Sequence, residues 1–240
     1  MTKKSSVMTT SGSTAHGLTE REKDDSYMTQ LQVQYIDHMG NDDSVVNAAR
    51  VSFAKEASNF PAENNHKLIR YLAEHKHEIP FAHTAITMRV RAPISVRTQC
   101  FKHKVGFVEN EVSRRYVTDT PELFLPTFRT APQGNVKQGS GGEHNENELL
   151  QEVYQSISQE CLECYESMIK NGVAPEQARF ILPQGTMTEW VWTGSLLAFA
   201  RFYNLRTDSH AQKEIQDLAH MVGDVIKPLY PVSWTALTGA

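Results

Sequence analysis

The strongest constraint on the fold is a set of apolar residues near the C-terminus that recur at the spacing of one helix face. The set consists of Ile215, Leu218, Ala219, Val222 and Ile226. This spacing predicts an amphipathic helix that ends before Pro228, because proline cannot continue a helix. Ser209 and Gln212 are expected to form a capping box at its start, and we expect this to be the last helix of the chain.

Strand-like and helix-like segments precede this helix without regular alternation. Residues 31–36, 86–90 and 187–192 read as strands, whereas residues 41–53, 66–75, 93–101 and 149–169 have helical spacing. A short apolar segment, 180–182, ends at Pro183. The expected fold class is α+β, with a mixed or antiparallel sheet and several long helices, because a doubly wound sheet would need strict strand-helix alternation.

Composition limits the chain to one ordinary globular domain. It has 240 residues, of which 40% are hydrophobic and 22% are charged. No apolar run approaches the roughly 20 residues that cross a bilayer, and no apolar stretch marks a signal peptide. Three cysteines cannot all pair within one chain, so we expect a reducing, cytoplasmic setting and no membrane partner.

Two segments lack hydrophobic periodicity. Residues 1–28 are rich in Ser, Thr and Lys and are expected to form a disordered leader, because they bury too little apolar surface to offset the entropy of ordering. The remainder, 29–240, is expected to be a single domain. Within it, residues 131–147 are rich in Gly, Asn and charge, which predicts a mobile surface loop.

The stretch Lys102–Tyr116 is the centre of a basic segment in an acidic chain. From Arg89 to Arg115, seven Lys or Arg oppose two Glu, a balance of 7 − 2 = +5, although the whole chain carries −4. A local basic patch favours a specific phosphate-bearing ligand over general nucleic-acid binding. The structural alternative is a solvated charged face.

Two further features concern the arginines. In an extended chain, Glu111, Ser113 and Arg115 face one way while Val112 and Arg114 face the other, which would place phosphate donors on one side. The alternative is a ladder of surface salt bridges. Arg206 follows an apolar stretch and is expected near the core, where it is either functional or paired with Asp208 or capping a helix end.

Cysteine and histidine spacings give no metal or nucleophile motif. Cys161 and Cys164 form a lone CxxC, which we interpret as structural thiols, and Cys100 as a helix-packing residue. The histidines near His77 lack the HExxH spacing, and no glycine-rich phosphate loop occurs. We therefore expect no metal, and phosphate contacts made by side chains.

Several blocks together resemble the flavin-dependent thymidylate synthases, whose signature is RHR followed after seven residues by Ser. The chain has KHK at 102–104 and NEVSRRY at 110–116, with two Arg-to-Lys exchanges and a gap of eight residues. We expect a bulge or longer turn around Gly106 to accommodate the added residue. Other blocks are AARVSF at 48–53, HEIPFAH at 77–83, RAPISVRTQCF at 91–101, QARFILP at 177–183 and NLRTDSHAQ at 204–212.

The resemblance implies a homotetramer with FAD sites where subunits meet. The implied reaction converts dUMP to dTMP, with methylenetetrahydrofolate as carbon donor and NADPH or NADH as reductant of the flavin, without a cysteine nucleophile. Arg206 is implied to be the catalytic cation beside the uracil ring. The implied dUMP ligands are Gln99, Lys102, Glu111, Val112, Ser113, Arg114, Arg115, Arg179 and Arg206. The implied FAD ligands are His77, Ile79, Lys102, His103, Lys104, Glu111, Ser195, Leu197 and Arg201, and His77 is also placed near the folate.

Two other functions remain open at the level of sequence. One is a catalytically altered relative that binds nucleotides or nucleic acid through the basic segment. The other is a flavoprotein oxidase that reduces oxygen without methylating dUMP. A flavin absorption spectrum separates the first from the enzyme, and release of tritium from [5-³H]dUMP separates the second.

Overall fold

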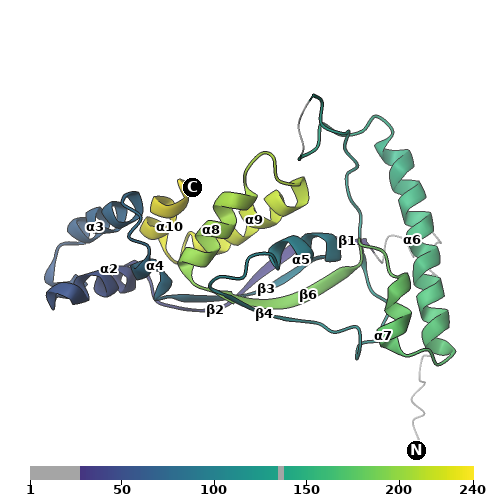
Figure 1. Ribbon diagram of the computed structural model, residues 1–240, viewed down its shortest axis with the longest axis horizontal. Helices are drawn as coiled ribbons and strands as arrows, with labels where there is room; N and C mark the ends of the chain where they lie inside the picture. The colour runs from purple at the N-terminus through teal and green to yellow at the C-terminus, as the bar shows by residue number, and fades with distance from the viewer. Residues whose placement is uncertain (1–27, 135–137) are drawn as a thin grey trace, which may run out of the picture.

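The computed structural model describes residues 28–134 and 138–240. The expected leader therefore lies outside the described residues except for Met28, which belongs to a short strand. Figure 1 shows an elongated molecule with a sheet at its centre, α2, α3 and α10 at one end and α6 at the other. Among the described residues, no helix is both long and apolar enough to cross a bilayer.

The central sheet has four strands in the order β2-β3-β6-β4, and all of its neighbours are antiparallel. Its strands are β2 (Gln32–Met39), β3 (Ala85–Pro93), β6 (Met187–Gly194) and β4 (Phe107–Glu111). A bulge interrupts the register of β2 between Tyr35 and Asp37. Two short strands, β1 (Met28–Thr29) and β5 (Leu123–Phe124), pair in parallel beside it. The α+β class and the antiparallel sheet are thus confirmed.

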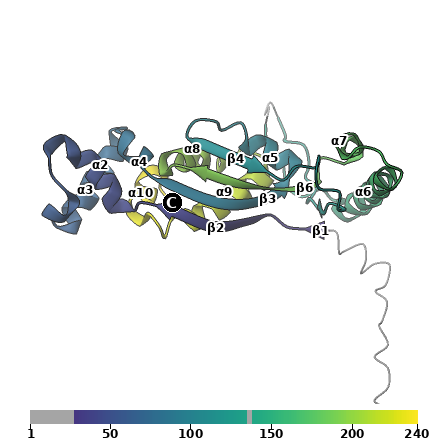
Figure 2. The ribbon, with the colours of Figure 1, turned by 90° about the horizontal axis from the view of Figure 1, so that it is seen from below.

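Helices cover one face of the sheet and extend beyond both of its ends. Figures 1 and 2 place α5, α8 and α9 on one side of the strands. The helices are α2 (Asp42–Arg50), α3 (Ala62–Glu74), α4 (Ile79–Ala82), α5 (Ile94–Cys100), α6 (Asn147–Lys170), α7 (Pro175–Ala178), α8 (Leu196–Arg206), α9 (Lys213–Ile226) and α10 (Pro231–Thr238). Single 3₁₀ turns are η1 (Val51–Phe53), η2 (Ala57–Asn59) and η3 (Arg179–Ile181).

Aromatic side chains fill the space between the sheet and α8. Phe107 of β4 stacks on Trp192 of β6 with ring centroids 4.6 Å apart, and Phe199 and Phe202 of α8 meet Trp192 edge-on. Such edge-to-face pairs are favourable beyond the area that they bury. All three tryptophans, Trp190, Trp192 and Trp234, are buried, so the aromatic core fixes the position of α8.

The strands and four earlier helices that periodicity predicts are present, but the region around α9 needs two corrections. The capping box is wrong: Gln212 is the N-cap residue of α9, yet its side chain makes no capping hydrogen bond. Its amide instead bonds Gln99 and Glu214. Nor is α9 the last helix, because Pro231 begins α10.

The segment 131–147 contains no helix or strand in its described part until α6 begins at Asn147. A single bridge joins Arg129 to Glu143 and closes the segment at its base. This agrees with the loop that was predicted, whereas its mobility stays a prediction.

Candidate functional site

The basic segment runs from β3 through α5 to β4, and a turn between α5 and β4 carries Lys102, His103 and Lys104. Pro93 precedes the first turn of α5, where its missing N–H leaves no hydrogen bond unmade, and the helix ends at Cys100. Gly106 has φ +82°, and a Cβ there would lie 2.9 Å from Ala198 Cβ, so only glycine fits this turn. A turn is present at Gly106 and brings the chain back to enter β4 at Phe107. That this turn accommodates the added residue stays a prediction.

A cavity of about 500 Å³ lies between β4, β6 and η3. Five residues that the resemblance assigns to dUMP line it together: Glu111, Val112, Ser113, Arg114 and Arg179. Residues that the sequence did not single out for ligand binding complete the wall, among them Arg97, Phe180, Thr186 and Thr188. Sequence reasoning placed Arg97 in the basic segment but gave it no role, and no motif marks the two threonines.

The cavity is electropositive and contains free hydrogen-bonding capacity. Its charged lining residues are Arg97, Arg114, Arg179 and Glu111, a balance of 3 − 1 = +2. Arg97 Nε lies 2.9 Å from Glu111 Oε1, and the Thr188 hydroxyl donates to the same oxygen at 2.7 Å. Thr186 is 1% exposed, and its hydroxyl has no hydrogen-bond partner among the described residues. Such a buried, unpartnered hydroxyl at a cavity wall suits contact with a ligand.

The extended geometry expected for Glu111–Arg115 is wrong beyond Ser113. The strand ends at Glu111, and the backbone N–H groups of Tyr116 and Val117 donate to Ser113 O in a turn. Arg114 therefore joins Glu111 and Ser113 at the cavity. The Arg115 guanidinium points to Glu176, with Nε 3.2 Å from Oε2, in an exposed ion pair of the kind proposed as the structural alternative.

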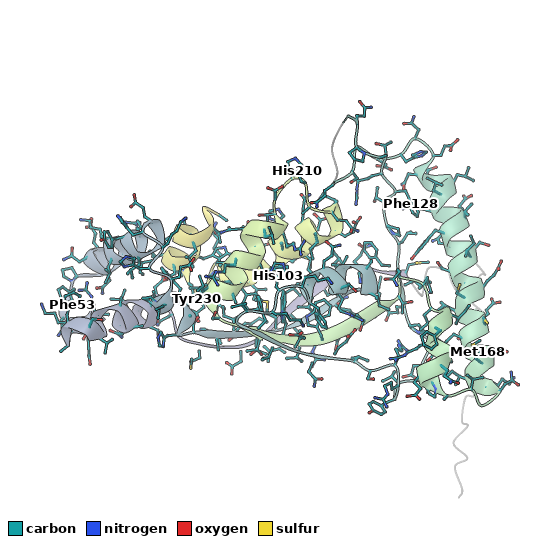
Figure 3. The ribbon with its side chains drawn as sticks, in the orientation of Figure 1. Phe53, His103, Phe128, Met168, His210 and Tyr230 are labelled. Atoms are coloured by element: carbon teal, nitrogen blue, oxygen red, sulfur yellow. The ribbon has the colours of Figure 1, made fainter. Side chains whose placement is uncertain are left out.

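Arg206 lies at the end of α8, where it joins two elements of the basic segment. Its Nε donates to His103 Nε2 at 2.9 Å, and its Nη2 donates to Gln99 O at 3.3 Å. The second contact caps the end of α5, as one structural alternative proposed, whereas Asp208 pairs with His210 instead. Figure 3 shows His103 near the middle of the molecule and His210 on the loop after α8.

Burial keeps His103 neutral, and the contact with Arg206 determines which ring nitrogen carries the proton. Burial, and secondly the Arg206 charge, lower the pKa of His103 from 6.5 to about 4, so the ring is neutral at pH 7. Because guanidinium only donates, Nε2 must accept and the proton resides on Nδ1. Arg206 uses two of its five N–H donors in these contacts, and the other three have no acceptor among the described residues.

Cys100 lies on α5, close enough for the Arg206 charge to act on it, but it is unsuited to nucleophilic chemistry. Its side chain is fully buried, and burial raises the pKa of the thiol far above its usual range despite the opposing effect of Arg206. Cys161 and Cys164 are also free thiols, and both lie on α6.

Among the described residues, most of those assigned to FAD lie apart from this cavity, although Glu111 lines it. Ile79, the first residue of α4, is 75% exposed, and His77 is exposed before it. Arg201 of α8 pairs with Glu78, Lys104 pairs with Glu109, and Lys102 has no ion-pair partner among the described residues. Ser195 caps α8 by accepting from Ala198 N, and Leu197 lies in the core.

Sequence and structure comparisons agree on the relatives of this chain. Residues 34–232 match the family described as thymidylate synthase complementing protein. The flavin-dependent thymidylate synthase of Thermosipho melanesiensis is 37% identical over 206 residues, covering 85% of this chain and 87% of that protein. That of Thermotoga neapolitana is 36% identical over 203 residues, covering 85% and 88%.

A solved structure gives the same relation. The UMP/dUMP methylase PolB from Streptomyces cacaoi, bound with 5-Br dUMP, superimposes with a TM-score of 0.81 at 29% identity, covering 88% of this chain and 97% of that one. Family match, sequence identity and shared architecture thus point to one conclusion: the chain belongs to the family of flavin-dependent thymidylate synthases.

Proposed function

We propose that this protein is a methyltransferase that converts dUMP to dTMP with FAD as its cofactor. The observation that carries the proposal is the cavity lined by Arg97, Arg114, Arg179 and Glu111. A dianionic phosphate monoester matches a cavity with a net positive charge and hydroxyl donors. Relatives named flavin-dependent thymidylate synthase and a neighbour named UMP/dUMP methylase support the reaction class.

In this proposal, the nucleotide lies between the cavity and Arg206. Arg97, Arg114, Arg179, Ser113 and Thr186 would hold the phosphate and sugar. By the resemblance, Gln99, Lys102 and Arg115 also contact dUMP, although the Arg115 side chain points to Glu176 in this structure.

Arg206 would stabilise negative charge on the uracil ring. Uracil C5 is a weak nucleophile, so a fixed cation at the N3 and O2 edge lowers the energy of the anionic form. Neutral His103 and the Gln99 carbonyl hold the guanidinium in place without neutralising it. This activation needs no thiolate, which agrees with the buried, protonated Cys100.

The residues assigned to FAD fit a dinucleotide that lies on a surface. Lys102, Lys104 and Arg201 offer cations for a diphosphate, and exposed His77 and Ile79 offer flat or apolar contact for a ring. When bound, FAD supplies the hydride that the methyl transfer requires, after reduction by NADPH or NADH. Methylenetetrahydrofolate would donate the carbon.

Because these FAD residues are exposed on one chain, we propose that a second copy completes the flavin site in a homotetramer. Light scattering of the FAD-loaded protein should give the mass of four chains. A monomer that keeps stoichiometric flavin would contradict this part of the proposal.

The reaction itself is tested by incubating the purified protein with [5-³H]dUMP, methylenetetrahydrofolate, FAD and NADPH. Tritium release together with dTMP formation is the expected result. A yellow protein that consumes NADPH and oxygen without releasing tritium would be an oxidase. A colourless protein with salt-dependent affinity for oligonucleotides would be a nucleic-acid-binding relative.

A further inference from the structure

A largely buried ion pair lies outside the proposed nucleotide cavity, where the segment before α6 meets the start of α9. Arg129 Nη2 donates to Glu214 Oε1, and the two side chains are 17% and 9% exposed. Arg129 Nε also donates to Ser140 Oγ at 2.8 Å. Burying two charges costs more than a surface pair unless their remaining bonding capacity is satisfied, so such a pair gives little stability by itself.

The second oxygen of Glu214 begins a chain of amides that leads to the proposed dUMP site. Gln212 Nε2 donates to Glu214 Oε2 at 2.8 Å, and Gln99 Nε2 donates to Gln212 Oε1 at 2.7 Å. The backbone oxygen of Gln99 accepts from Arg206. Arg129, Glu214, Gln212 and Gln99 thus form one continuous series, which we name the amide relay.

The charged end of the amide relay sets the direction of every bond in it. An ionised carboxylate only accepts, and a guanidinium only donates. Gln212 must therefore turn its NH₂ group toward Glu214 and its carbonyl toward Gln99. Gln99 in turn must donate its NH₂ group to Gln212, so neither amide is free to flip.

We propose that Glu214, held by Arg129, is a positioning residue that fixes the rotamer and amide direction of Gln99 for nucleotide binding. The inference rests on the proposed function, because it assigns Gln99 to dUMP. Gln212 is exposed and Gln99 is only half-buried, and two such amides would rotate freely in water without a buried charge to orient them. Gln212 therefore replaces a local helix-capping bond with this tertiary role.

The test is the affinity of the FAD-loaded protein for dUMP, measured by calorimetry, in Gln99→Ala, Glu214→Gln, Gln212→Ala and the double variant Gln99→Ala/Glu214→Gln. Each single variant should raise the Kd about three- to tenfold, the effect of one hydrogen bond. The double variant should match Gln99→Ala, because Glu214 acts only through Gln99. In saturating dUMP, kcat of Gln212→Ala should be unchanged.

Gln216→Ala is the matched control, because Gln216 lies on the same helix and donates to Ala211 O at 2.8 Å, outside the relay. Its Kd should equal that of the wild type. If the increase in Kd of the double variant equals the product of the increases in Gln99→Ala and Glu214→Gln, the amide relay is wrong. An unchanged Kd in Gln212→Ala would also overturn the amide relay, while leaving the proposed function intact. A wild-type protein that does not bind dUMP would overturn the proposed function and the relay together. Because Gln212 is exposed, its substitution keeps the test valid even if Glu214→Gln fails to fold.

Discussion

The residues assigned to the nucleotide and those assigned to the flavin differ in how one chain arranges them. Glu111, Ser113, Arg114 and Arg179 converge on one cavity, and the Arg97 and Glu111 side chains there are only 25% and 23% exposed. Of the flavin set, Ile79 is 75% exposed and the Arg201 side chain is 50% exposed. A single chain thus forms the whole cavity that we propose for the nucleotide, whereas the residues that we propose for the flavin lie exposed on its surface.

Arg206 and Arg201 lie on the same helix and provide the sharpest test of this division. Arg206→Ala should lower tritium release from dUMP by about 10²- to 10³-fold, the usual cost of removing a donor that stabilises a developing anion. Flavin content, measured by absorbance, should be unchanged. Arg201→Ala should instead reduce flavin content. If both variants lose dUMP turnover and flavin content alike, the nucleotide and flavin residues do not form separate sites.

The lining of the cavity also predicts how strongly each neighbouring arginine contributes to dUMP affinity. Arg179→Ala and Arg114→Ala should raise the dUMP Kd about 10- to 100-fold, because each would lose a charge-assisted hydrogen bond to phosphate. Arg115→Ala should change it less than about fivefold, because the Arg115 guanidinium pairs with exposed Glu176. Titration of the three variants checks the order. A larger increase in the dUMP Kd for Arg115→Ala than for Arg114→Ala would contradict this order and would favour the extended geometry predicted from the sequence.

Lys102 is the position where the two regions should overlap. Its ammonium is exposed and has no ion-pair partner among the described residues. Lys102→Ala should weaken dUMP and FAD together by about two- to fivefold each, as expected for one solvent-screened charge. Lys102→Arg is the control that preserves the charge. If both affinities stay at wild-type values in Lys102→Ala, the residue is outside the site.

The smallest expected effect concerns His103, on the boundary between the regions. Its folded-state pKa of about 4 lies below the ordinary 6.5, so the unfolded chain binds a proton more readily. Its contribution to stability is therefore complete above about pH 6.5 and is lost as pH falls toward 4. His103→Gln should flatten the pH dependence of the unfolding free energy in this window, measured by urea titration. Equal slopes in both proteins would show that His103 is not held neutral.

Periodicity predicted the elements that have one buried face and missed those that do not. The strands β3 and β6 alternate between buried and partly exposed positions over most of their length, and α9 has a single apolar stripe. Helix α8 buries six of its first seven residues, from Leu196 to Phe202, and therefore has no stripe to detect. Hydrophobic spacing cannot distinguish such a helix from other core segments.

Sequence patterns also failed for polar residues of the site whose partners lie far away in the sequence. The family resemblance singled out Glu111, Ser113 and Arg179, which come from two separate blocks of the sequence, and the structure brings all three to one cavity. Local patterns failed where a side chain bonds something far away: Gln212 matched a capping box, yet its amide bonds Gln99 and Glu214. Thr186 could not be found from sequence, since its importance comes from burial at a cavity wall.

The burial of all three tryptophans has an optical consequence. Trp190, Trp192 and Trp234 are each about 1% exposed, so their emission should be that of indole shielded from water and should shift to the red when the core opens. Flavin absorbs where tryptophan emits, so a flavin bound near α8 should quench this emission by energy transfer. The protein therefore carries an intrinsic fluorescent reporter that distinguishes unfolding, seen as a wavelength shift, from cofactor binding, seen as a loss of intensity.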